Sequence, residues 1–261
     1  FSLDQKSYKR RTYIVAFKLL VVYPFRLIVI ILNLSKDSLM TTSSKFKRVM
    51  MVAPRSTGGN FEYVAIPRQG LLFLSGALQQ WKGEFLYERE IWYEDRCGNI
   101  DPDKDLEKTD ILMITALINE APRAYQIAQA AKAHHPQMKM IGGGPHMSLL
   151  AEEALRVADF DVIVQREGED IIGMLCDTLL RYDGAELTAK LHKIPGISFI
   201  DHGQFVETTR RGVIAPDFVE LPDFASVRNL TPQNPMVRSS SFLIISRHLV
   251  TPAWPIAPSP C

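Results

Sequence analysis

Residues 111–146 read ILMITALINEAPRAYQIAQAAKAHHPQMKMIGGGPH, and this stretch decides the fold class. It begins with an apolar run, 111–116, of the kind that forms a strand covered on both faces. Residues 121–134 predict a helix, and 138–141 predict a second strand that runs into a glycine-rich turn. A strand, a helix and a strand in this order predict two parallel strands joined by a right-handed crossover.

The alternation of strands and helices extends in both directions, from Lys47 to Tyr182. The further predicted elements are strands over 49–53, 85–93 and 162–164 and helices over 67–81, 148–157 and 169–182. Five strands that alternate with helices predict an α/β domain with a flavodoxin-like (Rossmann-like), doubly wound parallel sheet. In such a sheet the ligand crevice lies at the carboxyl ends of the strands.

The remaining chain predicts smaller parts. Residues 197–200 and 204–208 flank Asp201-His202-Gly203, which is a hairpin signal. Residues 217–235 are rich in proline and predict a linker, and an apolar run over 242–246 is where a second domain would open. We expect an N-terminal extension (1–45), an α/β domain (46–185), a β-hairpin extension (186–215), and a linker with the truncated start of a second domain (216–261).

Composition and charge exclude several classes of protein. The 261 residues include 30 Lys and Arg against 29 Asp and Glu, so the net charge of +1 gives no global field that favours nucleic acid. A hydrophobic content of 46% with 23% charged residues argues against disorder. Cys97, Cys176 and Cys261 are few, odd in number and far apart, which excludes a disulfide framework and predicts a reducing, cytoplasmic setting.

The N-terminal region contains an apolar stretch over 13–34. It carries Lys18, Pro24 and Arg26, which are unfavourable at bilayer depth, and no small-residue cleavage site follows it. Two interpretations stay open: a segment that associates with a membrane, or an extension ahead of the α/β domain. We favour the extension.

The turn Gly142-Gly143-Gly144-Pro145-His146 is the most informative candidate site. Three residues without a Cβ allow a large flat ligand to approach the backbone, and the helix that follows offers free amides to a phosphate. The alternative is a tight strand-to-helix turn with no ligand. We favour the ligand, because a plain turn does not need three glycines. His146 fits a capping or packing role as well as a cofactor contact.

Three other loops follow predicted strands at the same edge of the sheet. Their candidate residues are Ser56 and Thr57 in the loop 55–60, Thr115, Ala116 and Leu117 after the third strand, and Glu167, Gly168 and Glu169 after the last strand. Turn chemistry also explains the first loop, and the helix dipole also explains Glu169. A G-x-G-x-x-G loop after the first strand, a phosphate-binding loop, a zinc motif and the aspartates of a phospho-accepting receiver domain are all missing.

Together these features resemble the N-terminal cobalamin-binding domain of cobalamin-dependent radical S-adenosylmethionine enzymes. The resemblance covers residues 47–246 and rests on the segments 67–71, 141–146, 168–169, 194–197 and 221–223. It implies that the corrin ring lies over the carboxyl edge of the sheet and that its nucleotide tail enters a groove. By resemblance, the residues that line this groove are Thr115, Ala116, Gly142, Gly143, Gly144, Pro145, His146, Glu167 and Gly168. The position of the loops at the same edge adds Ser56, Thr57, Leu117 and Glu169 to the predicted cofactor-binding residues.

Two departures from this family shape the expected function. The D-x-H-x-x-G motif, whose histidine binds cobalt in some relatives, has no counterpart over 54–70. No C-x-x-x-C-x-x-C motif follows Ser246-Arg247, so we expect the [4Fe-4S] cluster and S-adenosylmethionine only in a missing domain, and no radical chemistry from this chain alone.

The expected function is therefore that of a cobalamin-binding module from a methyltransferase-like or cyclase-like radical enzyme. It would position the corrin for a catalytic barrel that this fragment lacks. The alternative is a flavodoxin-like sensor of small molecules, or a docking module, without a metal cofactor. We expect cobalamin as the partner and no nucleic acid, and the sequence does not identify the substrate.

Overall fold

The computed structural model describes residues 45–57, 68–209, 212 and 221–229. The chain divides into two compact units, 1–46 and 47–261, and the fold described here is that of the second. Several predictions lie outside the described residues: those for the apolar stretch 13–34, for Gly58 to Asn60, for Pro67 and for the strand over 242–246. Within the described part of the chain, no helix is long and apolar enough to cross a membrane.

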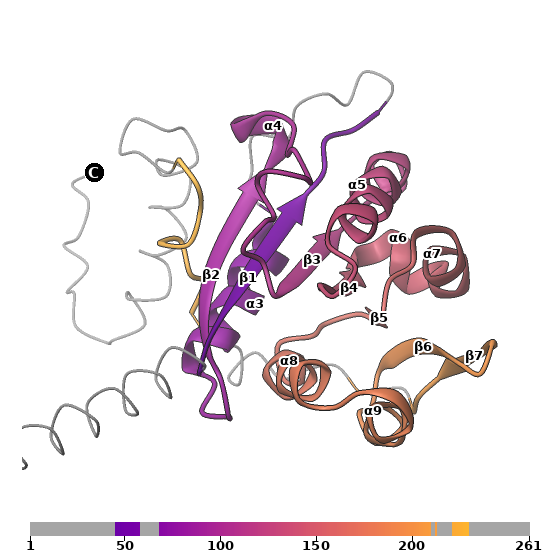
Figure 1. Ribbon diagram of the computed structural model, residues 1–261. Helices are drawn as coiled ribbons and strands as arrows, with labels where there is room; N and C mark the ends of the chain where they lie inside the picture. The colour runs from indigo at the N-terminus through magenta and orange to yellow at the C-terminus, as the bar shows by residue number, and fades with distance from the viewer. Residues whose placement is uncertain (1–44, 58–67, 210–211, 213–220, 230–261) are drawn as a thin grey trace, which may run out of the picture. The chain divides into compact units, whose positions relative to one another are not determined.

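The domain is built on one sheet of seven strands in the order β2-β1-β3-β4-β5-β6-β7 (Figure 1). The strands are β1 (Phe46–Ala53), β2 (Leu86–Tyr93), β3 (Ile111–Thr115), β4 (Lys139–Gly143), β5 (Val162–Val164), β6 (Ile197–Asp201) and β7 (Gln204–Glu207). The pairs β1–β3, β3–β4 and β4–β5 are parallel. The order of the first five strands is the flavodoxin-like one, which confirms the predicted fold class.

The strand count differs from the prediction because the hairpin joins the same sheet. Strand β6 pairs antiparallel with β5, where Ile163 lies opposite Ser198, and β7 pairs antiparallel with β6. The hairpin turn lies where the sequence predicts it, between β6 and β7, and it has positive φ at His202 and Gly203. The five-stranded core is therefore extended to seven strands by a short antiparallel edge.

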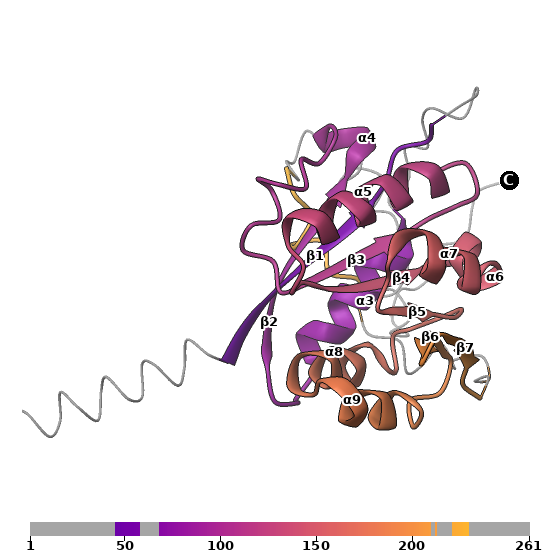
Figure 2. The same ribbon diagram turned by 45° about the vertical axis from the view of Figure 1, so that its right-hand side comes forward.

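Helices cover both faces of the sheet (Figure 2). They are α3 (Gln69–Gln80), α4 (Glu94–Cys97), α5 (Ala121–His134), α6 (Gly144–Leu149), α7 (Ala151–Ala158), α8 (Ile172–Arg181) and α9 (Gly184–Leu191). One buried cluster joins the sheet to α3 and α8, and a second joins it to α5, α6 and α7. The sheet is therefore the middle of three layers.

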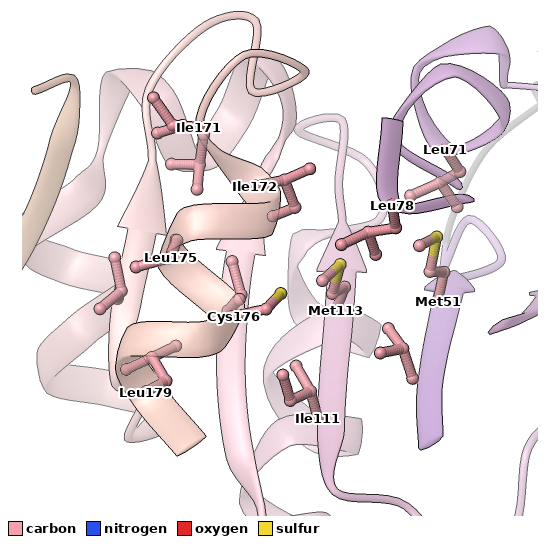
Figure 3. Packing of buried hydrophobic residues seen from close by; sticks show 14 of the residues in the cluster. Met51, Leu71, Leu78, Ile111, Met113, Ile171, Ile172, Leu175, Cys176 and Leu179 are labelled. Carbon is pink, nitrogen blue, oxygen red and sulfur yellow. The ribbon is translucent and has the colours of Figure 1, made fainter. Parts of the chain in front are cut away.

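Alternation along the strands explains both cores. In β1, Val49 and Met51 face the first cluster, whereas Met50 and Val52 face the second. Figure 3 shows Met51 and Met113 of the sheet beside Leu78 of α3, with the apolar residues of α8 close by. Because both faces are buried, these strands are continuous apolar runs in the sequence.

The elements around the glycine turn differ from the prediction. Strand β4 continues to Gly143, and helix α6 begins at Gly144, so the turn is divided between the two elements. The helix predicted over 148–157 is two helices, because Leu150 leaves the helical conformation with φ −120° and ψ 46°. Helices α4 and α9 were not predicted from the sequence.

The described part of the predicted linker, residues 221–229, lies against α3 and β2. The amide of Asp223 donates to the Leu72 carbonyl at 3.0 Å, and that of Ile91 donates to the Ser226 carbonyl at 2.8 Å. The buried Asp223 carboxylate accepts a hydrogen bond from Ser75 Oγ at 2.7 Å and lies 3.4 Å from Arg89 Nη2. Backbone hydrogen bonds and side-chain contacts thus both attach residues 221–229 to α3 and β2.

Replacing Asp223 with asparagine is expected to lower the free energy of unfolding by about 2 kcal/mol at pH 7. Burial alone would raise the pKa of Asp223, but hydrogen bonds from Ser226 and Ser75 and the charge of Arg89 lower it. A lowered folded pKa stabilises the protein above the ordinary value of about 4, and this contribution disappears as the pH falls further. Urea unfolding at several pH values measures the difference between the two proteins.

The expected difference between wild type and Asp223→Asn is largest near neutral pH and shrinks below about pH 4. The control is Asp103→Asn, because the side chain of Asp103 is 61% exposed and its pairing with His134 lies at the surface. A difference that stayed constant down to pH 2 would contradict the assignment of the effect to the charge of Asp223.

Candidate functional site

A pocket lies at the carboxyl ends of β3, β4 and β5, the edge at which this fold places its ligands. Its volume is about 470 Å³, which is in the range of small-molecule sites. The loops after these strands form part of the wall, and the first turns of α3 supply Gly70, Leu71 and Leu74. The topology therefore gathers segments that are far apart in the sequence.

Most of the predicted site residues lie in this pocket. The predicted residues that line it are Thr115, Gly142, Gly143, Gly144, Pro145, Glu167, Gly168 and Glu169. They come from the ends of β3 and β4, the start of α6 and the loop after β5, which meet because parallel strands end at the same edge of the sheet.

The loop residues Ser56 and Thr57 lie outside the pocket lining and contact the neighbouring loop. The side-chain amide of Asn119 donates to Ser56 Oγ at 3.1 Å, and the amide of Thr57 donates to the Asn119 carbonyl at 3.1 Å. These contacts join the ends of β1 and β3. The role of Ser56 and Thr57 toward a ligand stays a prediction.

Ala116 and Leu117 also lie outside the pocket lining. Ala116 is fully buried, and its amide donates to the Gly143 carbonyl at 3.2 Å. Leu117 is 37% exposed, and its amide donates to Glu120 Oε2 at 2.9 Å. Ala116 thus helps to hold the glycine turn in place through its backbone.

His146 is buried on the side of the sheet covered by α5. Its Nε2 lies 2.9 Å from the hydroxyl of Tyr125, which donates to Glu153 Oε1 at 3.2 Å, so Nε2 is the donor to the Tyr125 oxygen. Burial, and then the charge of Glu153, raise the pKa of Tyr125 and keep its hydroxyl protonated. The structure therefore gives His146 a packing contact, and no histidine lines the pocket among the residues described.

The three positions of the glycine turn differ in what a side chain would meet there. A Cβ on Gly142 would meet Ile163 and, at 2.7 Å, the sulfur of Met147. Gly144 has a φ of +86°, and a Cβ there would meet Thr115 and the backbone of Ala116. The fold therefore requires a glycine at position 144, whereas a side chain at position 142 would force Ile163 and Met147 to move.

Gly143 is different from its two neighbours. Its backbone is extended, with φ −167°, and the nearest atom to a Cβ would be the Val164 carbonyl oxygen at 3.7 Å. Nothing in the described protein therefore requires a glycine at this position. The missing side chain leaves a section of the pocket wall open to a ligand.

Glu169 brings a carboxylate to a wall that is otherwise largely apolar. Its Oε2 is buried and has no hydrogen-bond partner among the described residues. Burial raises the pKa of Glu169, and hydrogen bonds from the amides of Glu169 and Gly168 oppose this shift. A buried acceptor without a partner is costly, so this oxygen is suited to a donor supplied by a ligand.

Sequence reasoning did not select several residues that line the pocket: Gly70, Leu71, Leu74, Met113, Ile114, Ile141, Ser148, Leu149, Val164, Arg166 and Ile172. The sequence did contain a signal for Gly70 and Leu71 at the start of α3, since the segment 67–71 carries part of the family resemblance. Arg166 has a left-handed φ of 59°, and its amide donates to Ser148 Oγ at 3.0 Å. The left-handed conformation of Arg166 could not be predicted from its sequence.

Known proteins give two kinds of match. Two solved structures of the radical S-adenosylmethionine methyltransferase TsrM from Kitasatospora setae are similar in fold. One, with tryptophan substrate and the SAM analog aza-SAM bound, has 15% identity and a TM-score of 0.49 over 62% of this chain and 30% of that chain. The other, with cobalamin and a [4Fe-4S] cluster bound, has 14% identity and a TM-score of 0.50 over 67% and 31%.

The chain thus spans about a third of the length of these methyltransferase structures. At such low identity the likeness concerns the fold alone. No curated protein matches the sequence. A family model described as the B12 binding domain matches residues 103–175, which include β3, β4 and β5 and the loops that form the pocket. The match over residues 103–175 agrees with the cobalamin-binding domain that the resemblance to cobalamin-dependent radical enzymes implied.

Proposed function

We propose that this domain binds cobalamin in the pocket at the carboxyl edge of its sheet. The observation that carries the proposal is the open wall at Gly143, inside the region that matches the B12-binding family. A Cβ would occupy this space, and no described side chain fills it. The unpartnered Glu169 oxygen is a second feature that suits a ligand with hydrogen-bond donors.

The size of the pocket indicates which part of the cofactor enters it. A volume of about 470 Å³ suits a drug-sized group, whereas a complete corrinoid is much larger. We therefore assign the pocket to the nucleotide tail and place the corrin ring over its mouth. Leu149 lines the pocket and is 84% exposed, so it offers apolar surface there.

The residues of this chain would hold the cofactor without binding its cobalt through histidine. The ring of His146 is directed to Tyr125, and no histidine lines the pocket among the described residues. When bound, cobalamin supplies exchange of a methyl group or an electron. The pocket residues bind and orient the tail, and the apolar wall excludes water from it.

We further propose that this domain serves an enzyme related to the cobalamin-dependent radical methyltransferases or cyclases. The fold shared with a methyltransferase structure that contains cobalamin supports this proposal. In such an enzyme the [4Fe-4S] cluster and S-adenosylmethionine would belong to a separate catalytic domain. A reducing, cytoplasmic setting is part of the proposal, since Cys97 and Cys176 are both free thiols.

Reconstitution with hydroxocobalamin tests the proposal directly. The purified chain is mixed with an excess of the cofactor, desalted and examined by absorbance. We expect corrin absorbance to remain with the protein at about one equivalent per chain. Complete loss of this absorbance would refute cobalamin binding and would favour a sensor or docking module at the same edge of the sheet.

A further inference from the structure

Backbone amides satisfy part of the Glu169 carboxylate, but its buried Oε2 has no hydrogen-bond partner among the described residues. We propose that Glu169 determines which corrinoids the pocket accepts, by accepting a hydrogen bond from the nucleotide tail. The domain then prefers corrinoids with a complete tail to those without one. This inference rests on the proposed binding of cobalamin and extends it to the choice between cofactor forms.

The backbone around Glu169 is held firmly against the pocket wall. A Cβ on the preceding residue, Gly168, would lie 3.0 Å from Val164 Cγ1 and 3.2 Å from Leu74 Cδ2. The amides of Ile171 and Ile172 donate to the Gly168 carbonyl at 3.1 and 2.9 Å. The start of this loop is thus packed against β5 and α3, and its end is fixed to the first turn of α8, which restricts where the Glu169 side chain can lie.

The surroundings of the carboxylate show why a ligand donor suits it. Leu71, Val164 and Ile172 line the same pocket and are buried apolar residues. They offer no hydrogen bond, and Oε2 has no partner among the described groups. In an apolar environment a hydrogen bond to a charged acceptor is stronger than the same bond in water. A donor from the ligand would therefore contribute to affinity.

The chemistry of the nucleotide tail matches this end of the pocket. The tail carries a ribose hydroxyl, which can donate to a carboxylate, and a phosphodiester, which binds guanidinium groups. Arg166, in the same loop, also lines the pocket, and no ion pair involves it among the described residues. Arg166 can therefore bind the phosphate of the tail, and Glu169, three residues further along, can accept a hydrogen bond from its ribose hydroxyl.

Titrations with two corrinoids test the inference. Cobalamin and cobinamide, which lacks the nucleotide, are titrated into wild type, Glu169→Gln and Glu169→Leu. We expect wild type to bind cobalamin more tightly than cobinamide. We expect Glu169→Leu to weaken cobalamin binding by roughly tenfold or more, Glu169→Gln to weaken it less, and neither to alter cobinamide binding by more than about twofold.

The matched control is Asp170→Asn, which removes the same charge one residue further along. Asp170 is exposed and does not line the pocket, so both affinities should remain at their wild-type values. Thermal melts of all variants check that they fold. If Glu169→Leu does not fold, Glu169→Gln still tests the inference.

Each outcome distinguishes the inference from the proposed function. If wild type binds neither corrinoid, the proposed function fails. If wild type binds cobalamin and the folded Glu169 variants bind it equally well, the inference alone fails. Equal weakening of both corrinoids would also overturn it, because Glu169 would then act on something other than the nucleotide tail.

Discussion

Replacing Gly143 with valine is expected to weaken cobalamin binding by roughly 100-fold while leaving the fold intact. The backbone at Gly143 is extended, and the nearest atom to a Cβ would be the Val164 carbonyl oxygen at 3.7 Å. A Cβ therefore fits the protein at this position, and the methyl groups of valine would enter the space assigned to the nucleotide tail. Titration followed by corrin absorbance measures the affinity, and a thermal melt measures the stability.

The control for this variant is a second glycine-to-valine change outside the pocket. Among the described residues, no atom lies within 4 Å of a Cβ at Gly212, and Gly212 does not line the pocket, so Gly212→Val should bind cobalamin as wild type does. If Gly143→Val folds and binds with unchanged affinity, the ligand does not occupy the open wall. If the domain is a sensor or docking module instead, Gly143→Val should leave the binding of its own partner unchanged.

The fold could be predicted from the sequence because burial on both faces leaves a strong pattern. Strand β5 and helix α5 were predicted with the same bounds that the structure has, since each combines an apolar pattern with clear ends. Helix α4 was missed because four residues after a strand carry too little periodicity. The pairing of β6 with β5 was missed because a hairpin signal says nothing about which other strand it joins.

The candidate site could be predicted only as far as the topology of the sheet allows. Loops after parallel strands were expected at one edge, and the structure brings Thr115, Gly143 and Glu169 to one pocket there. The contribution of Leu74 comes from the packing of α3, which sequence order does not reveal. His146 was selected for its place beside the glycines, but its ring turns to Tyr125.

The glycine turn combines the two interpretations that the sequence left open. Gly142 and Gly144 are explained by packing and by backbone conformation, as in a plain turn. Only Gly143 leaves space that the protein does not use. Variants at adjacent positions should therefore separate stability from binding, with Gly143 affecting the ligand and Gly144 affecting the fold.

Replacing Gly144 with alanine is expected to lower the free energy of unfolding by about 3 kcal/mol. Its φ of +86° is strained for any residue with a Cβ. The added methyl group would also meet Thr115 Oγ1 and would lie 3.0 Å from the Ala116 amide nitrogen. Urea unfolding of wild type and variant at neutral pH measures the loss.

The same crowding would disturb the connection between β3 and α6, because the Ala116 amide donates to the Gly143 carbonyl and the Ala116 carbonyl accepts from the His146 amide at 3.1 Å. The matched control is Gly143→Ala, which adds the same methyl group one residue earlier and should change stability by less than about 1 kcal/mol. Equal stability of the two alanine variants would contradict the left-handed conformation at Gly144. A loss confined to Gly144→Ala would show that the fold requires a glycine at position 144 and tolerates a side chain at position 143.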